Sequence, residues 1–287
     1  MFVRVLRLIL IVALVMTVTM PKAHAVTTNK DQGLTITPIS QGLSGKAGET
    51  LHGSVSVSNF SSKPLGVIMS TKQFTVTDHS YNYTFEPLVY DWVTMENPGM
   101  TLQPSETKKV DFTVTIPSVI AAGGYNFALL ATAPLTSAST GQVASLLYVQ
   151  VDGAGVQRTS SLQNGHVPLI AFSGDIPFRY GIANTGNVAF DAQLSAQLTG
   201  VSMNYAVAAT SRTVVQQTTR DIQGTLPAPF WPGLYKVTYG YKPDYAASAL
   251  LASAYVLYVP LWSIVAVVLV VLIALRLWQR YHHKRQA

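Results

Sequence analysis

The segment KKVDFTVTIP, residues 108–117, carries the pattern that decides the fold. From Val110 to Ile116 every second side chain is apolar, and Asp or Thr fills the positions between them. Successive side chains of a β-strand point to opposite faces of its sheet, so this period of two predicts one buried and one solvated face. The segment therefore predicts an antiparallel sheet packed on one side against a hydrophobic core.

Comparable segments lie on both sides of this strand. In HGSVSVSNF, residues 52–60, Val55 and Val57 alternate with serines, and turns rich in Gly, Pro, Asn and Ser separate such segments. Pro38 is expected at a sheet edge or where a strand changes sheets. About seven or eight short strands over roughly 125 residues, without helical periodicity, are typical of an immunoglobulin-like β-sandwich. We predict such a sandwich over residues 26–152.

The same pattern recurs after a predicted linker, which consists of the turn DGAG at residues 152–155 and a polar run up to Gly165. Residues 174–190 resemble residues 48–65, because in both an acidic turn enters an alternating strand, an Asn-containing turn ends it, and an apolar strand follows. Tyr125 and Tyr235 each follow a Gly-containing turn and begin a strand, as a structural corner tyrosine does. We therefore predict a second sandwich over residues 153–258, which makes the outer region all-β with two tandem immunoglobulin-like β-sandwiches.

An apolar segment, PLWSIVAVVLVVLIALRLW at residues 260–278, follows the second sandwich. It carries no charged residue before Arg276, and a helix of this length is about 28 Å long, close to the thickness of the hydrocarbon core of a bilayer. Trp262 and Trp278 stand near its two ends, where interfacial aromatic residues are found. We predict one C-terminal transmembrane α-helix over residues 259–278.

Basic residues gather on the C-terminal side of this segment. Arg276 and Arg280 are expected at the membrane interface, and Lys284 and Arg285 follow in the basic tail, residues 279–287. By the positive-inside rule this tail is cytoplasmic and both sandwiches are extracellular. The sequence thus predicts a single-pass protein of the cell membrane.

The N-terminal segment also indicates that the protein is exported. Arg4 and Arg7 precede an apolar run at residues 8–18, and AHA at residues 23–25 matches the pattern read by signal peptidase. We predict a signal peptide over residues 1–25 that is cleaved after Ala25; an uncleaved signal anchor is the alternative.

The positive net charge reflects this topology. Of the 19 Lys and Arg residues, three lie in the signal peptide and four near the C-terminus, which leaves 12 against 13 Asp and Glu residues in the outer region. With this balance of charges the outer region lacks the excess of basic residues that nucleic-acid binding needs. The absence of cysteine excludes thiol catalysis and Cys-ligated zinc.

Sequence motifs of enzymes are missing. The chain contains no G-x-S-x-G, H-E-x-x-H, Walker A or dinucleotide-binding motif, and the outer histidines are far apart. We therefore expect no catalytic residues, no metal, no cofactor and no enzymatic activity. A wall hydrolase that uses a carboxylate pair such as Glu86 and Asp91 is an alternative.

Aromatic side chains are the remaining signal for a binding site. Aromatic rings stack on sugars and anchor protein interfaces, and four of them cluster in the first domain. The predicted ligand-binding residues are Tyr81, Tyr83, Tyr90 and Trp92. A second pair, at residues 230–231 of the second domain, could bind a ligand or enter the headgroup region of a membrane.

The order of segments resembles a known bacterial family. The chain resembles the WxL-interacting proteins of Gram-positive-type bacterial surfaces. It shares with them four motifs, two tandem modules, a single span and a basic tail. The motifs are Gly48-Glu49-Thr50, SVSVSN at residues 54–59, LQPSET at residues 102–107 and Gly123-Gly124-Tyr125. The resemblance implies that the first module binds peptidoglycan and that the second binds the host.

Two functions are consistent with these features. The main prediction is a non-enzymatic, membrane-anchored bacterial surface protein that binds cell-wall peptidoglycan or another surface protein, as an adhesin or scaffold. The alternative is a chaperone-like assembly factor for exported surface proteins, which would act by strand pairing at an unpaired sheet edge.

Overall fold

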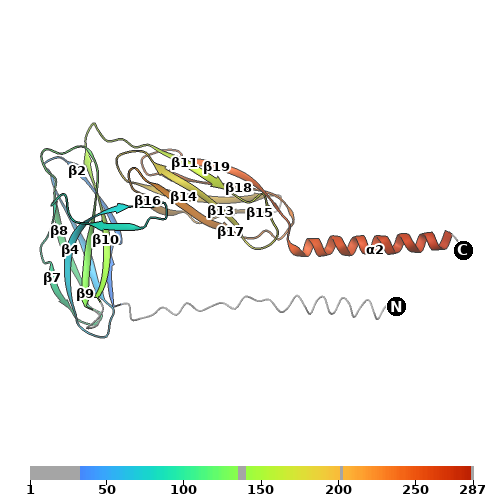
Figure 1. Cartoon of the computed structure of the whole chain (residues 1–287), viewed down its shortest axis with the longest axis horizontal. Coiled ribbons are helices and arrows are strands. Elements are labelled where there is room, and N and C mark those ends of the chain that lie inside the picture. Colours follow the sequence, from blue (N-terminus) through green and yellow to red (C-terminus); the bar gives the residue numbers. More distant parts are fainter. Residues whose placement is uncertain (1–32, 135–139, 201–202, 286–287) are drawn as a thin grey trace.

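The computed structural model describes residues 33–134, 140–200 and 203–285 of the 287-residue chain. The predicted signal peptide lies outside these residues. Two β-sandwiches, here called the first and second domains, meet at an angle and form an L shape (Figure 1). The helix α2 (Leu261–Arg285) leaves the far end of the second domain. The all-β prediction with two immunoglobulin-like sandwiches and one C-terminal helix is confirmed.

The first domain contains two sheets that enclose one core. Its four-stranded sheet has the order β1 (Leu34–Thr37), β3 (Thr50–Asn59), β8 (Thr107–Thr115) and β6 (Val93–Met95). Its six-stranded sheet has the order β2 (Ser40–Lys46), β10 (Thr140–Asp152), β9 (Gly123–Pro134), β4 (Leu65–Val76) and β5 (Tyr83–Glu86), with β7 (Gly99–Leu102) also paired to β4. The apolar side chains predicted from residues 108–117 are buried in this core.

Pro38 divides the first strand between the two sheets, as expected from its position in the sequence. Before it, β1 pairs antiparallel with β3; after it, β2 runs parallel to β10 in the other sheet. The parallel pairing begins where Ser40 lies opposite Leu146 and ends at Asp152. Only the second half of β10 is therefore covered on this side.

The second domain repeats this plan. Its three-stranded sheet has the order β11 (Ser160–His166), β13 (Ile176–Asn184) and β17 (Thr219–Leu226). Its six-stranded sheet has the order β12 (Ile170–Ala171), β19 (Leu250–Tyr258), β18 (Gly233–Pro243), β14 (Phe190–Gly200) and β15 (Met203–Ala206), with β16 (Thr210–Val214) also paired to β14. Again a short strand that follows the first one, β12, runs parallel to the end of the last strand, β19.

One polar strand differs from the sequence prediction. The sequence predicts a linker up to Gly165, but β11 pairs with β13 from Ser160 onward. Its side chains are half-buried or exposed, so the sequence lacks the apolar alternation that marks a half-buried strand.

A buried asparagine closes the same turn in both domains. The amide nitrogen of Asn59 donates to the carbonyl oxygens of Lys63, Leu102 and Gln103, and its side-chain oxygen accepts from the Ser61 amide. Asn184 is equally buried. Its side chain bonds the Val188 and Val214 carbonyls and the Gly186 amide. The sequence repeat thus reflects one structural device used twice.

The two corner tyrosines also match. Tyr125 donates its hydroxyl to the Ala121 carbonyl at 2.9 Å, and Tyr235 donates to the Trp231 carbonyl at 2.9 Å. Each bond ties the start of a strand to the turn four residues before it. The structural role predicted for both tyrosines is confirmed.

The terminal helix is longer than the predicted span. It continues past residue 278 to Arg285, because the tail contains no Gly or Pro to end it. Leu261–Gln279 is long and apolar enough to cross a membrane. Trp262 and Trp278 lie near the two ends of this stretch, and Arg276 is exposed close to the second end.

Replacing the buried asparagine tests its role. Asn184→Ala leaves two carbonyl oxygens and one amide without partners in a buried turn, so we expect the second domain to lose about 2–3 kcal/mol of unfolding free energy. Urea denaturation of the full chain measures this loss. Asn97→Ala, at an exposed position, is the matched control and should change the value by less than about 0.5 kcal/mol. Equal effects of the two substitutions would contradict the account.

Candidate protein-binding edge and interdomain corner

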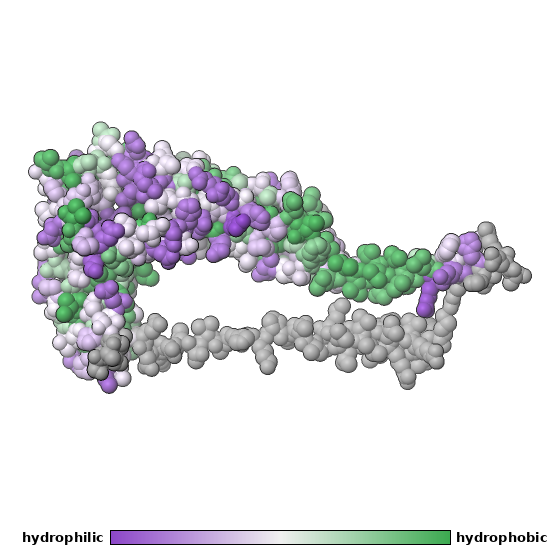
Figure 2. Space-filling model, viewed as in Figure 1, coloured by the Kyte–Doolittle hydropathy of each residue, from purple (hydrophilic) through white to green (hydrophobic). Residues whose placement is uncertain are grey.

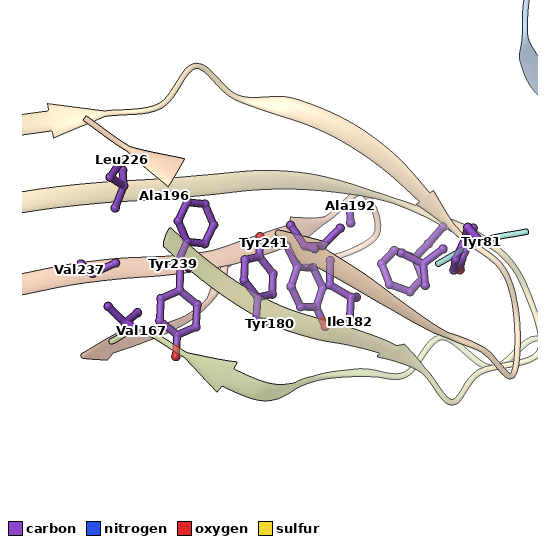
Figure 3. Close-up of a cluster of buried hydrophobic side chains, with 14 of the residues drawn as sticks. Tyr81, Val167, Tyr180, Ile182, Ala192, Ala196, Leu226, Val237, Tyr239 and Tyr241 are labelled. Atoms are coloured by element: carbon purple, nitrogen blue, oxygen red, sulfur yellow. The ribbon is translucent and has the colours of Figure 1, made fainter. Parts of the chain in front are cut away.

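Tyr81 joins the two domains. It belongs to the turn between β4 and β5 of the first domain, yet its ring is buried in the core of the second (Figure 3). Its hydroxyl oxygen accepts from the Val215 amide at 2.8 Å and shares a 2.8 Å hydrogen bond with the Thr218 hydroxyl. The Arg220 guanidinium lies 4.2 Å from the ring centre. Burial raises the pKa of Tyr81, so the hydroxyl stays neutral.

The turn that carries Tyr81 is held in shape by Asp78. Its carboxylate accepts hydrogen bonds from the backbone and side chain of Asn82, and these bonds lower the pKa of Asp78. Tyr81 itself has a φ of 65°, a left-handed conformation that is rare for a bulky residue. The strain is tolerated because the ring, hydroxyl and turn are all fixed by other contacts. The His79 carbonyl also accepts from the Asp221 amide at 2.9 Å.

A second group of contacts fixes the angle between the domains. The Gly124 amide donates to the Asn187 carbonyl at 2.7 Å, and Gln216 donates to the Gly124 carbonyl at 3.0 Å. Asn187 also donates to the Ala122 carbonyl at 3.3 Å. Gly124 has no side chain, which allows this approach, since an added Cβ would lie 3.2 Å from Asn187 and Gln216. Two separate groups of bonds therefore hold the corner.

The four aromatic residues predicted to bind a ligand do not form one site. Tyr81 and Tyr83 pack in the cluster shared with the second domain, whereas Trp92 and Tyr90 pack in the first domain. Trp92 is buried, and its ring lies 4.5 Å from that of Tyr125. Tyr81 and Trp92 present no open ring face, so the expectation that they stack on a ligand is corrected. Tyr83 and Tyr90 are half-buried beside them.

The first half of β10 has an open backbone edge. The Leu146 amide points away from β9 and donates to the Ile39 carbonyl, just before β2 begins. Because alternate residues of a strand direct their backbone groups to the same side, Thr140, Gln142 and Ala144 point the same way. In the described part of the chain, no strand pairs with this side of β10 before Leu146. Three N–H and three C=O groups are thus available to another strand.

This edge lacks the features that usually protect an edge strand. Its sequence from Thr140 to Ser145, TGQVAS, has no charge and no proline, and its register with β9 has no bulge. Several other edges are blunted: β11 has a bulge, β17 carries Arg220 and Asp221, and β5 and β6 are short. The open part of β10 is therefore suited to strand addition.

The second domain has a similar open half-strand. β12 pairs with β19 only at Leu257 and Tyr258, so the preceding residues of β19 have no partner on that side among the described strands. The open edge is thus a consequence of the shared plan, in which a short parallel strand covers only the end of the last strand.

A cavity of about 330 Å³ lies beside the second half of β10, which β2 covers. It lies at the corner between the domains, where the exposed side of β2 and part of β10 meet Asp191 and Asp244 of the second domain. β2 is an edge strand of its sheet, and its residues Ser40–Ser44 form one wall of this cavity. No Lys, Arg or His lines it, and no group of three potential metal ligands occurs among the described residues.

Comparisons with known proteins return similarities of fold only. No family model matches the chain, and no curated protein matches it. Solved structures similar in fold include the class 5 fimbriae chaperone CfaA, with 12% identity, a TM-score of 0.41, and coverage of 77% of this chain and 98% of that one. The CsuC–CsuE chaperone–tip adhesion subunit complex of Acinetobacter baumannii is similar with 13% identity, a TM-score of 0.40, and coverage of 79% of this chain and 99% of that one. The E. coli chaperone DraB is similar with 13% identity, a TM-score of 0.39, and coverage of 77% of this chain and 96% of that one.

Removing the Tyr81 hydroxyl tests the corner. Tyr81→Phe keeps the ring but leaves the buried Val215 amide without an acceptor, so we expect a loss of about 1–3 kcal/mol in unfolding free energy. The Val215 amide should also exchange its hydrogen faster than in the parent chain. Tyr255→Phe changes an exposed tyrosine and is the control. The corner would not depend on this hydroxyl if both substitutions gave the same stability and exchange.

Proposed function

We propose that this chain is a membrane-anchored, chaperone-like assembly factor that holds an extended segment of an exported protein. The segment would add as a strand to the first half of β10. The observation that carries this proposal is the uncharged, unpaired edge from Thr140 to Ser145. Main-chain hydrogen bonds supply the affinity in this mode of binding, and side-chain contacts supply the selectivity.

The side chains beside the edge define what kind of segment fits. Val143 packs against the core of the first domain, and Ala144 on the opposite face packs against the other apolar cluster. An added strand would place successive side chains next to these two faces in turn. We therefore expect a client segment of about six residues with small or apolar side chains and no proline at hydrogen-bonding positions.

β2 limits the length of the added strand. From Leu146 onward this side of β10 is occupied by β2, so a client would leave β10 there. It would then pass beside β2 toward the cavity at the corner, where hydroxyl groups, amides and two carboxylates are exposed to it. The fixed corner keeps the β10 edge and the cavity in one arrangement for the client.

The terminal helix would hold this edge at the place where exported proteins emerge. Its length and hydropathy support a membrane crossing. In this proposal the domains lie outside a bacterial cell, the C-terminal tail lies inside, and the chain is not an enzyme. Recognition of peptidoglycan, implied by the resemblance to WxL-interacting proteins, would need ring faces that the packing of Tyr81 and Trp92 does not leave free.

A proline at an outward-pointing position tests strand addition. Gln142→Pro removes one backbone donor from the open side and leaves the bonds between β10 and β9 in place, because the Gln142 amide points away from β9. We expect recovery of exported proteins crosslinked to the full chain in its own cells to fall about tenfold, equivalent to about 1.4 kcal/mol.

Two variants serve as controls. Gln142→Ala removes the side-chain bond to Thr132 but keeps the backbone, so it should retain the complexes. Ser253→Pro introduces the same change on the open edge of β19, away from the cavity, and should also retain them. Unchanged recovery with Gln142→Pro would contradict strand addition at β10. Sedimentation of the parent chain with purified peptidoglycan, without a protein partner, would favour the adhesin.

A further inference from the structure

The far end of the second domain exposes a group of large apolar side chains. Phe230 and Trp231, in the loop between β17 and β18, are 69% and 55% exposed. Beside them, Leu234, Leu257 and Ile170 lie opposite one another on three adjacent strands, so their side chains share one face of the sheet. All three are exposed. Figure 2 shows hydrophobic surface at this end that continues onto α2. These five residues are called the end patch.

The end patch is joined to the first turn of α2. The Trp262 indole donates to the Phe230 carbonyl at 3.1 Å, and the two rings stack with centres 5.5 Å apart. The ring of Trp231 lies 5.7 Å from that of Trp262. On the other side, Tyr235 donates to the Trp231 carbonyl, and the Asp175 carboxylate accepts from the Ala228 amide. The loop is therefore fixed both to the domain and to the helix.

The distance along the chain brings the end patch to the membrane surface. Leu257 precedes Leu261 by four residues, which span at most about 14 Å. The headgroup layer on each side of the hydrocarbon core is about 5–8 Å thick. No charged residue occurs between Asp244 and Arg276, so nothing in this segment opposes contact with lipid.

We infer that the end patch is seated in the outer headgroup layer of the membrane, so that the second domain stands on the bilayer by its end. Tryptophan and phenylalanine are favoured at this depth, and an exposed apolar patch that is continuous with a membrane-spanning helix meets lipid first. The inference rests on the proposed membrane crossing of α2 and is independent of strand addition at β10. It adds a contact with lipid headgroups to the function proposed above.

Site-directed spin labelling tests this seating in the full chain. The natural sequence has no cysteine, so each single cysteine accepts one nitroxide. In nanodiscs of phosphatidylcholine and phosphatidylglycerol, oxygen concentrates in lipid and a neutral nickel complex concentrates in water. Labels at Phe230→Cys and Leu257→Cys should give severalfold higher oxygen-to-nickel accessibility than labels at Ser253→Cys and Leu251→Cys.

Three of the four sites lie on one face of β19 and measure distance from the helix along that strand. Residues 251, 253 and 257 point to the same side of β19, and residue 251 is about 20 Å farther from the helix than residue 257. Val268→Cys, in the middle of α2, reports whether the helix is in lipid. Water accessibility at both 230 and 257 with lipid accessibility at 268 would overturn the seating. Lipid accessibility at all four domain sites would overturn the end-on orientation, and water accessibility at 268 would overturn the membrane crossing and the seating together.

Discussion

The structure depends on the burial of Tyr81 in a domain to which it does not belong in sequence. Its hydroxyl satisfies a buried amide, its ring fills the second core, and Arg220 stacks on it. A tyrosine in the left-handed conformation is held there by these contacts. Without them the Gly124 contacts and the linker would still join the two sandwiches, but the corner would lose one of the two groups of bonds that hold it.

The open edges follow from how each sandwich divides its first strand. Pro38 sends the chain from one sheet to the other, and β2 then covers only the second half of β10. The second domain does the same with β12 and β19. A single topological feature thus produces the open edge of β10 in the first domain and, at the far end of the second domain, an apolar row beside α2.

Much of the fold could be predicted from the sequence, because it rests on short-range signals. Alternation around Phe112 indicates a buried strand, and the two Asn-containing turns reveal the repeat. The binding site was harder, since an aromatic ring that fills a core and one that faces solvent have the same sequence. Tyr81 and Trp92 are of the first kind. The open half of β10 depends on where β2 begins to pair, which is a long-range property, although Pro38 already marked the change of sheet.

The most direct test of the central claim is residue-resolved hydrogen exchange along β10 in the full chain. Gly141 and Val143 direct their amides to β9, whereas Gln142 and Ala144 direct theirs to the open side. The account predicts fast exchange at Gln142 and Ala144 and slow exchange at Gly141 and Val143. Equal protection of all four amides would show that the edge is covered and would contradict the account.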